Sequence, residues 1–405
     1  MTYRIRKENK KLRGEIQLSG SKSISNRVLI IQALMGRDID KKNVSDSNDT
    51  KVLTQLLKSG ERIFDAHDAG TAFRFLTAYF AFNEGEWILT GSDRMKQRPV
   101  GDLVDPLGEL GAKIEYIEKA NFPPLKISGG RMQGGRVAVR SDISSQFASA
   151  LLMIAPCLKN GLTLQLTGEV VSQPYIEMTL SLMKHFGIDH TRNEQTIHIP
   201  HQQYHSNKIF IESDWSAASY YYEMAAFADE PELTLSGLLQ NSFQGDSAIA
   251  TLMESFGVMT TYKEEKILLT KSPSKNNFRF NLKDQPDLAP ALFVTCAGLS
   301  QEATFTGLEH LQYKESHREE ALQKELAKCG IAVTRSGDTI MIDGKFISRP
   351  YTFSTYLDHR MAMAFSPLAM LCSEIIIDDP LVVKKSYPQF WDHLQILGFD
   401  VEEIE

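Results

Sequence analysis

Cysteine is scarce in this sequence. Its 405 residues include only four cysteines, Cys157, Cys296, Cys329 and Cys372, which lie far apart in apolar segments and form no C-x-x-C pair. This distribution excludes a disulfide framework and a cysteine-ligated metal site, and it predicts reduced cysteines in the core of a cytoplasmic protein. The ten histidines show no metal-ligand pattern, and no G-x-S-x-G or cysteine nucleophile motif is present. We therefore expect no bound metal.

Long apolar runs and excess positive charge are also missing. The longest apolar runs, such as residues 150–155, are much shorter than the roughly 18 residues that span a membrane. The basic N-terminus lacks the apolar segment of a signal peptide. The formal net charge of −7 argues against a nucleic-acid or acidic-membrane surface. We expect a soluble protein that binds neither, in which any cation cluster is local and suits a small anionic ligand.

The sequence does contain a repeated pattern of an amphipathic helix, a glycine and a short β-like run. The glycines are Gly60, Gly111, Gly187, Gly257, Gly330 and Gly398, and each fits the position after a helix end, where a positive φ costs glycine nothing. The pattern is common in α/β proteins, but six copies favour an internally repeated α/β fold. The length allows two or three domains, and we expect the chain to cross between two of them near residues 19–20 and 212–214.

The segment from Ser19 to Arg27 is the first candidate site. Residues 14–18 alternate as a short strand does, and residues 28–35 read as an apolar helix, so a hydroxyl-rich loop with Lys22 and Arg27 lies between them. Free N–H groups at a helix start attract anions, and Lys22 and the hydroxyls add donors. The spacing is not that of a nucleotide P-loop. A serine N-cap with two solvated cations is the alternative.

Other helix starts repeat this chemistry. Residues 68–74 (DAGTAFR) form a small-residue turn in which the backbone at Gly70 can approach a ligand closely; the alternative is a capped helix with Arg74 in an ion pair. Ser144, Ser145 and Gln146 precede an apolar helix and could cradle a phosphate, although serine N-caps are frequent without a ligand. Ser172 offers a hydroxyl group before another helix in the same way.

Carboxylates begin two further apolar helices. Asp287 is either a plain N-cap or a base close to cations, and residues 358–360 (DHR) offer either acid–base groups or capping. Lys314 and Arg318 share a helix face, which could also be a solvated charged helix start.

Together these segments resemble the enolpyruvyl transferase family, and within it the EPSP synthases. The matching motifs are GSKSISNR (20–27), AGTA (69–72), RMKQRP (94–99), SSQF (144–147), PYI (174–176), PD (286–287), KESHR (314–318), DHRMAM (358–363) and KSYP (385–388). They occur in family order along nearly the whole chain. The resemblance implies an α/β fold of two domains, each built from three βαβαββ units, with the active site in the interdomain cleft. The domains would be residues 1–19 plus 213–405 and residues 20–212.

The resemblance also implies transfer of the enolpyruvyl group of phosphoenolpyruvate to the 5-hydroxyl of shikimate 3-phosphate, with release of phosphate and without a cofactor. The implied ligands of shikimate 3-phosphate are Lys22, Ser23, Arg27, Ser144, Ser145, Gln146, Ser172, Asp287, His310 and Lys314. Those of phosphoenolpyruvate are Lys22, Gly70, Arg98, Gln146, Arg318, Arg360 and Lys385. In the implied mechanism Asp287 removes the hydroxyl proton with help from Lys314, and Glu315 or Lys22 protonates the methylene carbon. We expect a monomer.

Charge arithmetic agrees with two such substrates. Each brings a carboxylate and a phosphate of about −1.5 to −2, so together they carry roughly −5 to −6. Seven candidate cations would offset that charge: Lys22, Arg27, Arg98, Lys314, Arg318, Arg360 and Lys385.

Four residues depart from the family pattern, and two alternative functions are also possible. Asp68 and His310 stand where the family usually has Asn, Gln312 replaces a frequent Arg, and His317 a usual Asp. One alternative is a non-catalytic anion-binding relative on the same scaffold. The other is the sister enzyme that enolpyruvylates UDP-N-acetylglucosamine, but residues 94–99 lack the Cys usual in its mobile loop, and Ser23 stands where it usually has Asn.

Overall fold

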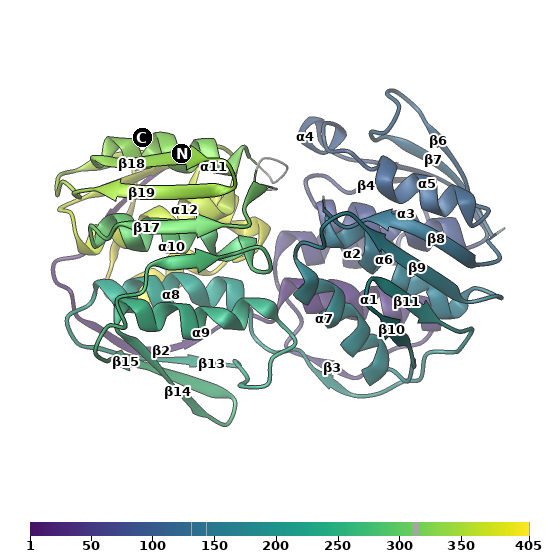
Figure 1. Cartoon of the computed structure of the whole chain (residues 1–405), viewed down its shortest axis with the longest axis horizontal. Helices are drawn as coiled ribbons and strands as arrows, with labels where there is room; N and C mark the ends of the chain where they lie inside the picture. The colour runs from purple at the N-terminus through teal and green to yellow at the C-terminus, as the bar shows by residue number, and fades with distance from the viewer. Residues whose placement is uncertain (131, 143, 310, 312–315, 405) are drawn as a thin grey trace. The chain divides into compact units, whose positions relative to one another are not determined.

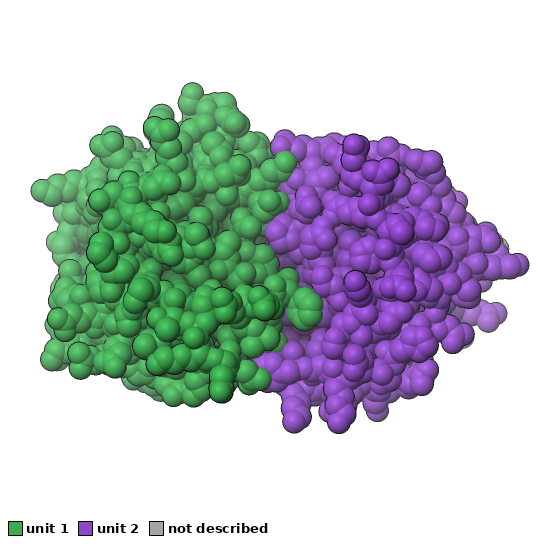
Figure 2. Space-filling model, turned by 60° about the horizontal axis from the view of Figure 1, so that its bottom comes forward, with its two compact units in different colours: residues 1–20, 212–405 green, residues 21–211 purple. Residues whose placement is uncertain are grey.

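The chain divides into two compact units (Figure 2). The computed structural model describes residues 1–130, 132–142, 144–309, 311 and 316–404. Unit 1 comprises Met1–Gly20 and Glu212–Glu405, and unit 2 comprises Ser21–Ile211. Each unit has its own cluster of buried apolar side chains, and the two clusters share no residue. That the units are independent domains with the boundaries expected from the sequence stays a prediction.

The described residues of unit 1 form three four-stranded mixed sheets. Figure 1 labels strands of two of them. In sheet order the strands of the three sheets are β14 (Val258–Lys263), β15 (Lys266–Lys271), β13 (Pro231–Ser236) and β2 (Leu12–Gln17); β16 (Arg279–Asn281), β17 (Ala303–Thr306), β19 (Thr339–Gly344) and β18 (Ile331–Ser336); and β20 (Tyr351–Phe353), β21 (Ile375–Asp378), β1 (Thr2–Arg6) and β22 (Asp400–Ile404). In each sheet, one pair of neighbouring strands is parallel and the other two pairs are antiparallel. This is the strand pairing expected of a βαβαββ unit.

Unit 2 repeats this pattern twice. Its four-stranded sheets are β4 (Ile63–Asp65), β5 (Gly85–Thr90), β7 (Leu125–Gly129) and β6 (Lys113–Tyr116); and β10 (Thr191–Asn193), β11 (Thr196–Ile199), β9 (Leu162–Thr167) and β8 (Gly135–Arg140). Among the described residues, the third sheet consists of the parallel pair β3 (Lys41–Lys42) and β12 (Ile209–Phe210). The expectation of three βαβαββ units is therefore met less completely in unit 2. Only four residues separate the helix of residues 48–58 from β4, and they leave no room for a hairpin.

Helices connect these strands. In unit 1 they are α8 (Trp215–Phe227), α9 (Ile249–Leu252), α10 (Ala289–Gly298), α11 (Arg318–Lys328), α12 (His359–Phe365) and α13 (Phe390–Ile396). In unit 2 they are α1 (Lys22–Met35), α2 (Asn48–Lys58), α3 (Gly70–Phe82), α4 (Asp93–Lys96), α5 (Gly101–Glu109), α6 (Ser145–Ile154) and α7 (Gln173–His185). No helix in the described ranges is both long and apolar enough to cross a membrane.

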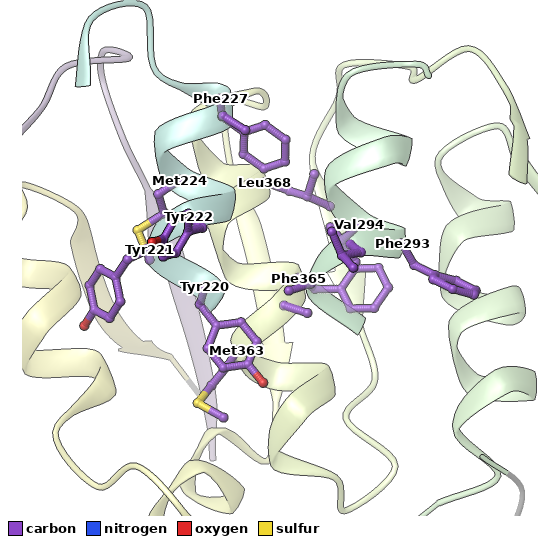
Figure 3. Packing of buried hydrophobic residues seen from close by; sticks show 14 of the residues in the cluster. Tyr220, Tyr221, Tyr222, Met224, Phe227, Phe293, Val294, Met363, Phe365 and Leu368 are labelled. Carbon is purple, nitrogen blue, oxygen red and sulfur yellow. The ribbon is translucent and has the colours of Figure 1, made fainter. Parts of the chain in front are cut away.

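Each core is built around helices that are apolar on nearly all sides. Such helices are buried all round, whereas an amphipathic helix buries only one face. In unit 1, α8, α10 and α12 pack against one another, and Figure 3 shows Tyr220, Val294 and Phe365 among their packed side chains. In unit 2, α1, α3 and α6 take this role. Helices α3, α6, α10 and α12 each follow the first strand of a parallel pair, so their N-termini lie at the carboxyl ends of strands, where α/β folds bind ligands.

The repeated glycines end helices as expected, with one exception. Gly111, Gly187, Gly257, Gly330 and Gly398 all have positive φ. Gly60 does not, because α2 already ends at Ser59 in an extended conformation, so the prediction for Gly60 was wrong.

Candidate functional site

The first group of candidate residues lies in unit 2 at the N-terminus of α1. Ser21 caps this helix by accepting a hydrogen bond from Ile24 N at 3.5 Å, so Lys22 and Ser23 occupy the first turn. The helix dipole and free N–H groups attract anions to this position. Lys22 Nζ lies 3.4 Å from Oδ2 of Asp49, a buried residue in the first turn of α2, and this ion pair fixes the direction of the lysine.

Arg27 lies one turn further along α1 and is buried. Its guanidinium donates to Thr179 Oγ1 (2.7 Å), Ser149 Oγ (3.1 Å) and the carbonyls of Ser23 (2.9 Å) and Tyr175 (3.2 Å). Burial lowers the pKa of Arg27 to about 10, so it remains charged at neutral pH. Arg27 thus ties α1 to α6 and α7, while its role as a ligand of a substrate carboxylate stays a prediction.

Gly70 begins α3 beneath two guanidinium groups. A Cβ built on Gly70 would clash with Arg98 Nη1 and would lie 2.7 Å from Arg74 Nη1. Arg74 donates to the Gly70 carbonyl at 3.1 Å and lies over the ring of Phe147. The Gly70 N–H donates to the Asp68 carbonyl at 2.9 Å. In this conformation Gly70 therefore contributes space for Arg98 rather than an amide ligand.

The loop that carries Arg98 is held against the loop before α3. Ser92 N donates to the His67 carbonyl at 3.1 Å, and Ser92 Oγ donates to Asp68 Oδ1. Asp68, one of the departures from the family pattern, therefore helps to join these two loops. The Arg98 Nε atom is buried and has no hydrogen-bond partner among the described residues.

Ser144, Ser145 and Gln146 lie where the sequence predicted, at the start of α6. Ser144 is the N-cap, with its Oγ 3.3 Å from Gln146 N, and Ser145 is buried. Gln146 Nε2 donates to Thr71 Oγ1 at 3.1 Å. This bond brings the start of α6 next to the start of α3.

Ser172 precedes α7 in a strained conformation. Its φ of 56° is uncommon for a non-glycine residue, and such outliers cluster at functional sites. The adjacent Val171 N donates to the Ser141 carbonyl at 3.2 Å, which joins the loops that follow the parallel strands β8 and β9. The serines before α6 and Ser172 therefore occupy neighbouring loops.

The second group lies in unit 1 and centres on Asp287, in the short 3-10 helix η4 (Pro286–Leu288) before α10. Asp287 Oδ1 accepts from Arg318 Nη1 at 3.3 Å, and its Oδ2 accepts from Arg360 Nη2 at 2.8 Å. Arg360 Nη1 also donates to the Asp287 carbonyl at 3.2 Å. Asp287 is thus not an N-cap but a carboxylate between two guanidinium groups.

Asp358 organises the same group from the start of α12. It caps that helix by accepting from Arg360 N at 3.0 Å, and its Oδ2 accepts from Arg318 Nε at 2.9 Å and Ser316 Oγ at 3.1 Å. Of the two interpretations of this segment, capping is therefore observed. Arg318 is completely buried and binds both carboxylates, so its predicted contact with phosphoenolpyruvate remains untested. Lys385 lies in the 3-10 helix η7 (Pro380–Lys385), which packs against α12.

Asp246 is a residue that sequence reasoning missed. It is buried in the 3-10 helix η2 (Gly245–Ala248) and accepts a hydrogen bond from Ser216 Oγ. Burial, followed by the negative charge of Asp287, raises its pKa to about 6, while Arg360 opposes the shift. Asp49 was missed as well, although an acid in the first turn of a helix whose sequence begins S-N-D was the available signal.

The described residues thus form two groups, one in each unit. Lys314, Glu315 and His310, together with Gln312, lie outside the described residues. In the part of the chain that the structure describes, no three His, Cys, Asp or Glu side chains are arranged to hold a metal ion.

Comparison with known proteins gives consistent matches. A family model described as EPSP synthase (3-phosphoshikimate 1-carboxyvinyltransferase) matches residues 6–61 and 55–394. The chain is 46% identical over 396 residues to the 3-phosphoshikimate 1-carboxyvinyltransferase of Bacteroides fragilis, covering 96% of this chain and 97% of that protein. It is 35% identical over 413 residues to the enzyme of the same name from Colwellia psychrerythraea, covering 95% and 96%.

Solved structures agree on the fold. EPSP synthase from Acinetobacter baumannii superposes with a TM-score of 0.79 at 20% identity, covering all of both chains. The enolpyruvyl transferase NikO from Streptomyces tendae superposes with a TM-score of 0.75 at 17% identity, covering 99% of this chain and 98% of that one. The predicted fold class is confirmed.

Proposed function

The chain belongs to the EPSP synthase family, and from this premise we propose that it transfers the enolpyruvyl group of phosphoenolpyruvate to the 5-hydroxyl of shikimate 3-phosphate, with release of phosphate. Family membership favours this reaction over a non-catalytic anion-binding role and over transfer to UDP-N-acetylglucosamine. Both substrates are small molecules.

The observation that carries the proposal is the position of Asp287 between Arg318 and Arg360. A carboxylate there can act as general base toward a hydroxyl, and the guanidinium groups beside it can hold an anionic partner. Lys385, on the segment packed against α12, is a further candidate cation in unit 1.

Unit 2 supplies the chemistry for the phosphorylated acceptor. Ser144, Ser145 and Ser172 hold the shikimate phosphate from adjacent helix starts, where N–H groups and hydroxyls favour an anion. Lys22, Ser23 and Arg27 hold the carboxylate, and Gln146 lies beside the ring. Arg98, which lies next to Gly70, helps to bind phosphoenolpyruvate. The proposed ligands of the two substrates therefore come from both units.

The reaction proceeds by addition and elimination. Asp287 takes the proton of the 5-hydroxyl, whose oxygen bonds to C2 of phosphoenolpyruvate while C3 receives a proton from Lys22 or Glu315. The resulting tetrahedral intermediate then loses a proton from C3 and its phosphate from C2, which restores the double bond. No cofactor is needed, because the substrate brings the leaving group.

Close approach of two such anions is costly without these cations. Two unit charges 4 Å apart repel by about 4 kcal/mol at an effective dielectric constant near 20. Lys22, Arg98, Arg360 and Lys385 can offset this repulsion.

Phosphate release from phosphoenolpyruvate tests the proposal. We expect release with shikimate 3-phosphate, and none with UDP-N-acetylglucosamine or without an acceptor. Release with UDP-N-acetylglucosamine alone would identify the sister activity, and no release with either acceptor would favour the non-catalytic alternative. A cytoplasmic monomer is also proposed, and sedimentation at the chain mass of 45.6 kDa would support the monomer.

A further inference from the structure

The turn before α12 contains two consecutive residues in the left-handed region. Tyr356 has a φ of 54° and Leu357 a φ of 57°, and Asp358 follows directly as the N-cap of α12. Bulky side chains avoid this region because Cβ comes too close to the following carbonyl oxygen. The Leu357 residue is 69% exposed, so burial of its side chain does not compensate for this strain. Other interactions must hold the turn.

Glu325 of α11 supplies them. It is 1% exposed, and its Oε1 accepts a hydrogen bond from the Tyr356 hydroxyl at 2.7 Å. Its Oε2 accepts from Ser354 N at 3.1 Å and from Lys328 Nζ at 2.5 Å. One buried carboxylate therefore binds both the backbone and the side chain of the strained turn. A strained conformation persists only where its surroundings determine it in this way.

Two further hydrogen bonds complete the support of this turn. Thr355 N donates to Asp378 Oδ1, at the end of β21, at 2.7 Å. Asp358 N donates to the Thr355 carbonyl at 2.9 Å. The backbone is therefore held on both sides of Tyr356 and Leu357.

The same helix binds the turn and the candidate site. Arg318 is the first residue of α11, and its Nε donates to Asp358 at 2.9 Å. Glu325 is seven residues later, which places it on the same face two turns along the helix. Helix α11 thus contacts both ends of the segment 354–358, through Glu325 at the first end and Arg318 at the second. Arg360 lies two residues after this segment.

We propose that Glu325 and Tyr356 are positioning residues for this enzyme: their hydrogen bond holds the left-handed turn so that Asp358 and Arg360 keep their geometry at Asp287. Neither residue touches a substrate in this proposal. It rests on the proposed function for the assignment of Arg360 to phosphoenolpyruvate. The competing explanation is that the bond only adds stability to unit 1.

Kinetics of Tyr356→Phe separate the two explanations. This substitution removes one hydroxyl and leaves Glu325 Oε1 without its partner. Because a hydrogen bond to a charged group is lost, we expect the KM for phosphoenolpyruvate to rise about tenfold, with the KM for shikimate 3-phosphate within about twofold of wild type. Tyr351→Phe is the matched control, since its hydroxyl also donates one hydrogen bond, to the Ile347 carbonyl, but not to this turn. The control should leave both KM values unchanged.

A second substitution tests the strain directly. Asn tolerates the left-handed region better than Leu, and position 357 is exposed, so Leu357→Asn relaxes the turn with little loss of packing. Adding it to Tyr356→Phe should restore the KM for phosphoenolpyruvate at least threefold toward wild type. A merely structural role would give a lower melting temperature, unchanged KM values and no rescue, and that result would overturn the proposal. Wild-type turnover is measured first: its absence would contradict the proposed function, whereas normal wild-type turnover with unchanged Tyr356→Phe kinetics would contradict the positioning role alone.

Discussion

The buried helices of the two units begin with different chemistry. In unit 1 the residues at these starts are carboxylates, namely Asp214 before α8, Asp287 before α10 and Asp358 before α12. In unit 2 they are small or hydroxyl residues, namely Ser21 before α1, Ala69 and Gly70 at α3, and Ser144 before α6. The four-stranded sheets of the two units share the same strand pairing, whereas the sheet of β3 and β12 has two strands.

This difference separates two ways of binding an anion. Asp214 and Asp358 cap their helices, so they satisfy N–H groups and offset the positive end of the dipole, and unit 1 has less of that field to offer a ligand. Its carboxylates instead orient guanidinium groups, as Asp287 does for Arg318 and Arg360. In unit 2 the caps of α1 and α6 are neutral serines, which leave the positive end of the dipole without a carboxylate counter-charge, and Lys22 adds a cation at α1. We infer that unit 1 depends on ion pairs and unit 2 on backbone donors and close approach.

Asp287→Asn tests the dependence of unit 1 on ion pairs, and it should have the largest effect of the proposed substitutions. We expect kcat to fall about 1000-fold, because the general base is lost and the two guanidinium groups lose their shared counter-charge. Steady-state kinetics with both substrates measure the effect.

Asp214→Asn is the matched control at an equivalent helix start. Asp214 Oδ1 accepts from Ala217 N at 3.0 Å, and Asn caps helices about as well as Asp, so turnover should stay within about twofold of wild type. Equal losses in both variants would show that removing a negative charge at any of these helix starts lowers turnover, and that the place of Asp287 between two guanidinium groups has no special role.

Gly70→Ala tests close approach in unit 2. Gly70 does not have a positive φ, and the atom that a Cβ would meet first, Arg98 Nη1, is the end of a flexible side chain. The protein should therefore fold normally and move Arg98 instead. We expect the KM for phosphoenolpyruvate to rise about tenfold or more, corresponding to one weakened charge-assisted contact, with a smaller change in kcat.

Gly108→Ala provides the comparison variant. Gly108 lies in α5, and a Cβ there would meet nothing within 4 Å. It should leave kinetics unchanged and slightly raise stability, because alanine favours the helix. If Gly70→Ala behaves in the same way, the position of Arg98 above Gly70 has no part in binding.

Local patterns were sufficient for much of the fold and for part of the candidate site. The helix start at Ser145 follows from a serine cap next to an apolar run. The helix at Lys22 does not: residues 22–27, which the sequence suggested as a loop, form the first turns of α1, so that prediction was wrong. Patterns within a short window cannot give partners that meet only after folding. Asp49 meets Lys22 from 27 positions away, and Arg318 meets Asp358 from 40. The pairing of β3 with β12, at the other end of unit 2, is a further contact of this kind.

The smallest expected effect concerns buried ionisable groups in the helices themselves. Arg27 in α1 has four hydrogen-bond acceptors, whereas both carboxylate oxygens of Glu223, in the middle of α8, have no hydrogen-bond partner among the described residues. Burial raises the pKa of Glu223 well above its usual value, so the folded protein retains a proton that the unfolded chain releases. Stability should therefore fall as the pH rises above the unfolded pKa near 4.5.

Glu223→Gln removes this dependence. We expect the variant to gain stability relative to wild type as the pH rises from 5 to 7, by up to about 1.4 kcal/mol per pH unit, in urea unfolding followed at both pH values. Glu302→Gln, at an exposed position, should show no such pH-dependent gain. Because the effect lies in the core of unit 1, turnover should be unchanged at temperatures well below melting. An equal effect of Glu223→Gln at pH 5 and pH 7 would mean that this carboxyl is not protonated in the fold, and the contrast between a satisfied Arg27 and an unsatisfied Glu223 would then fail.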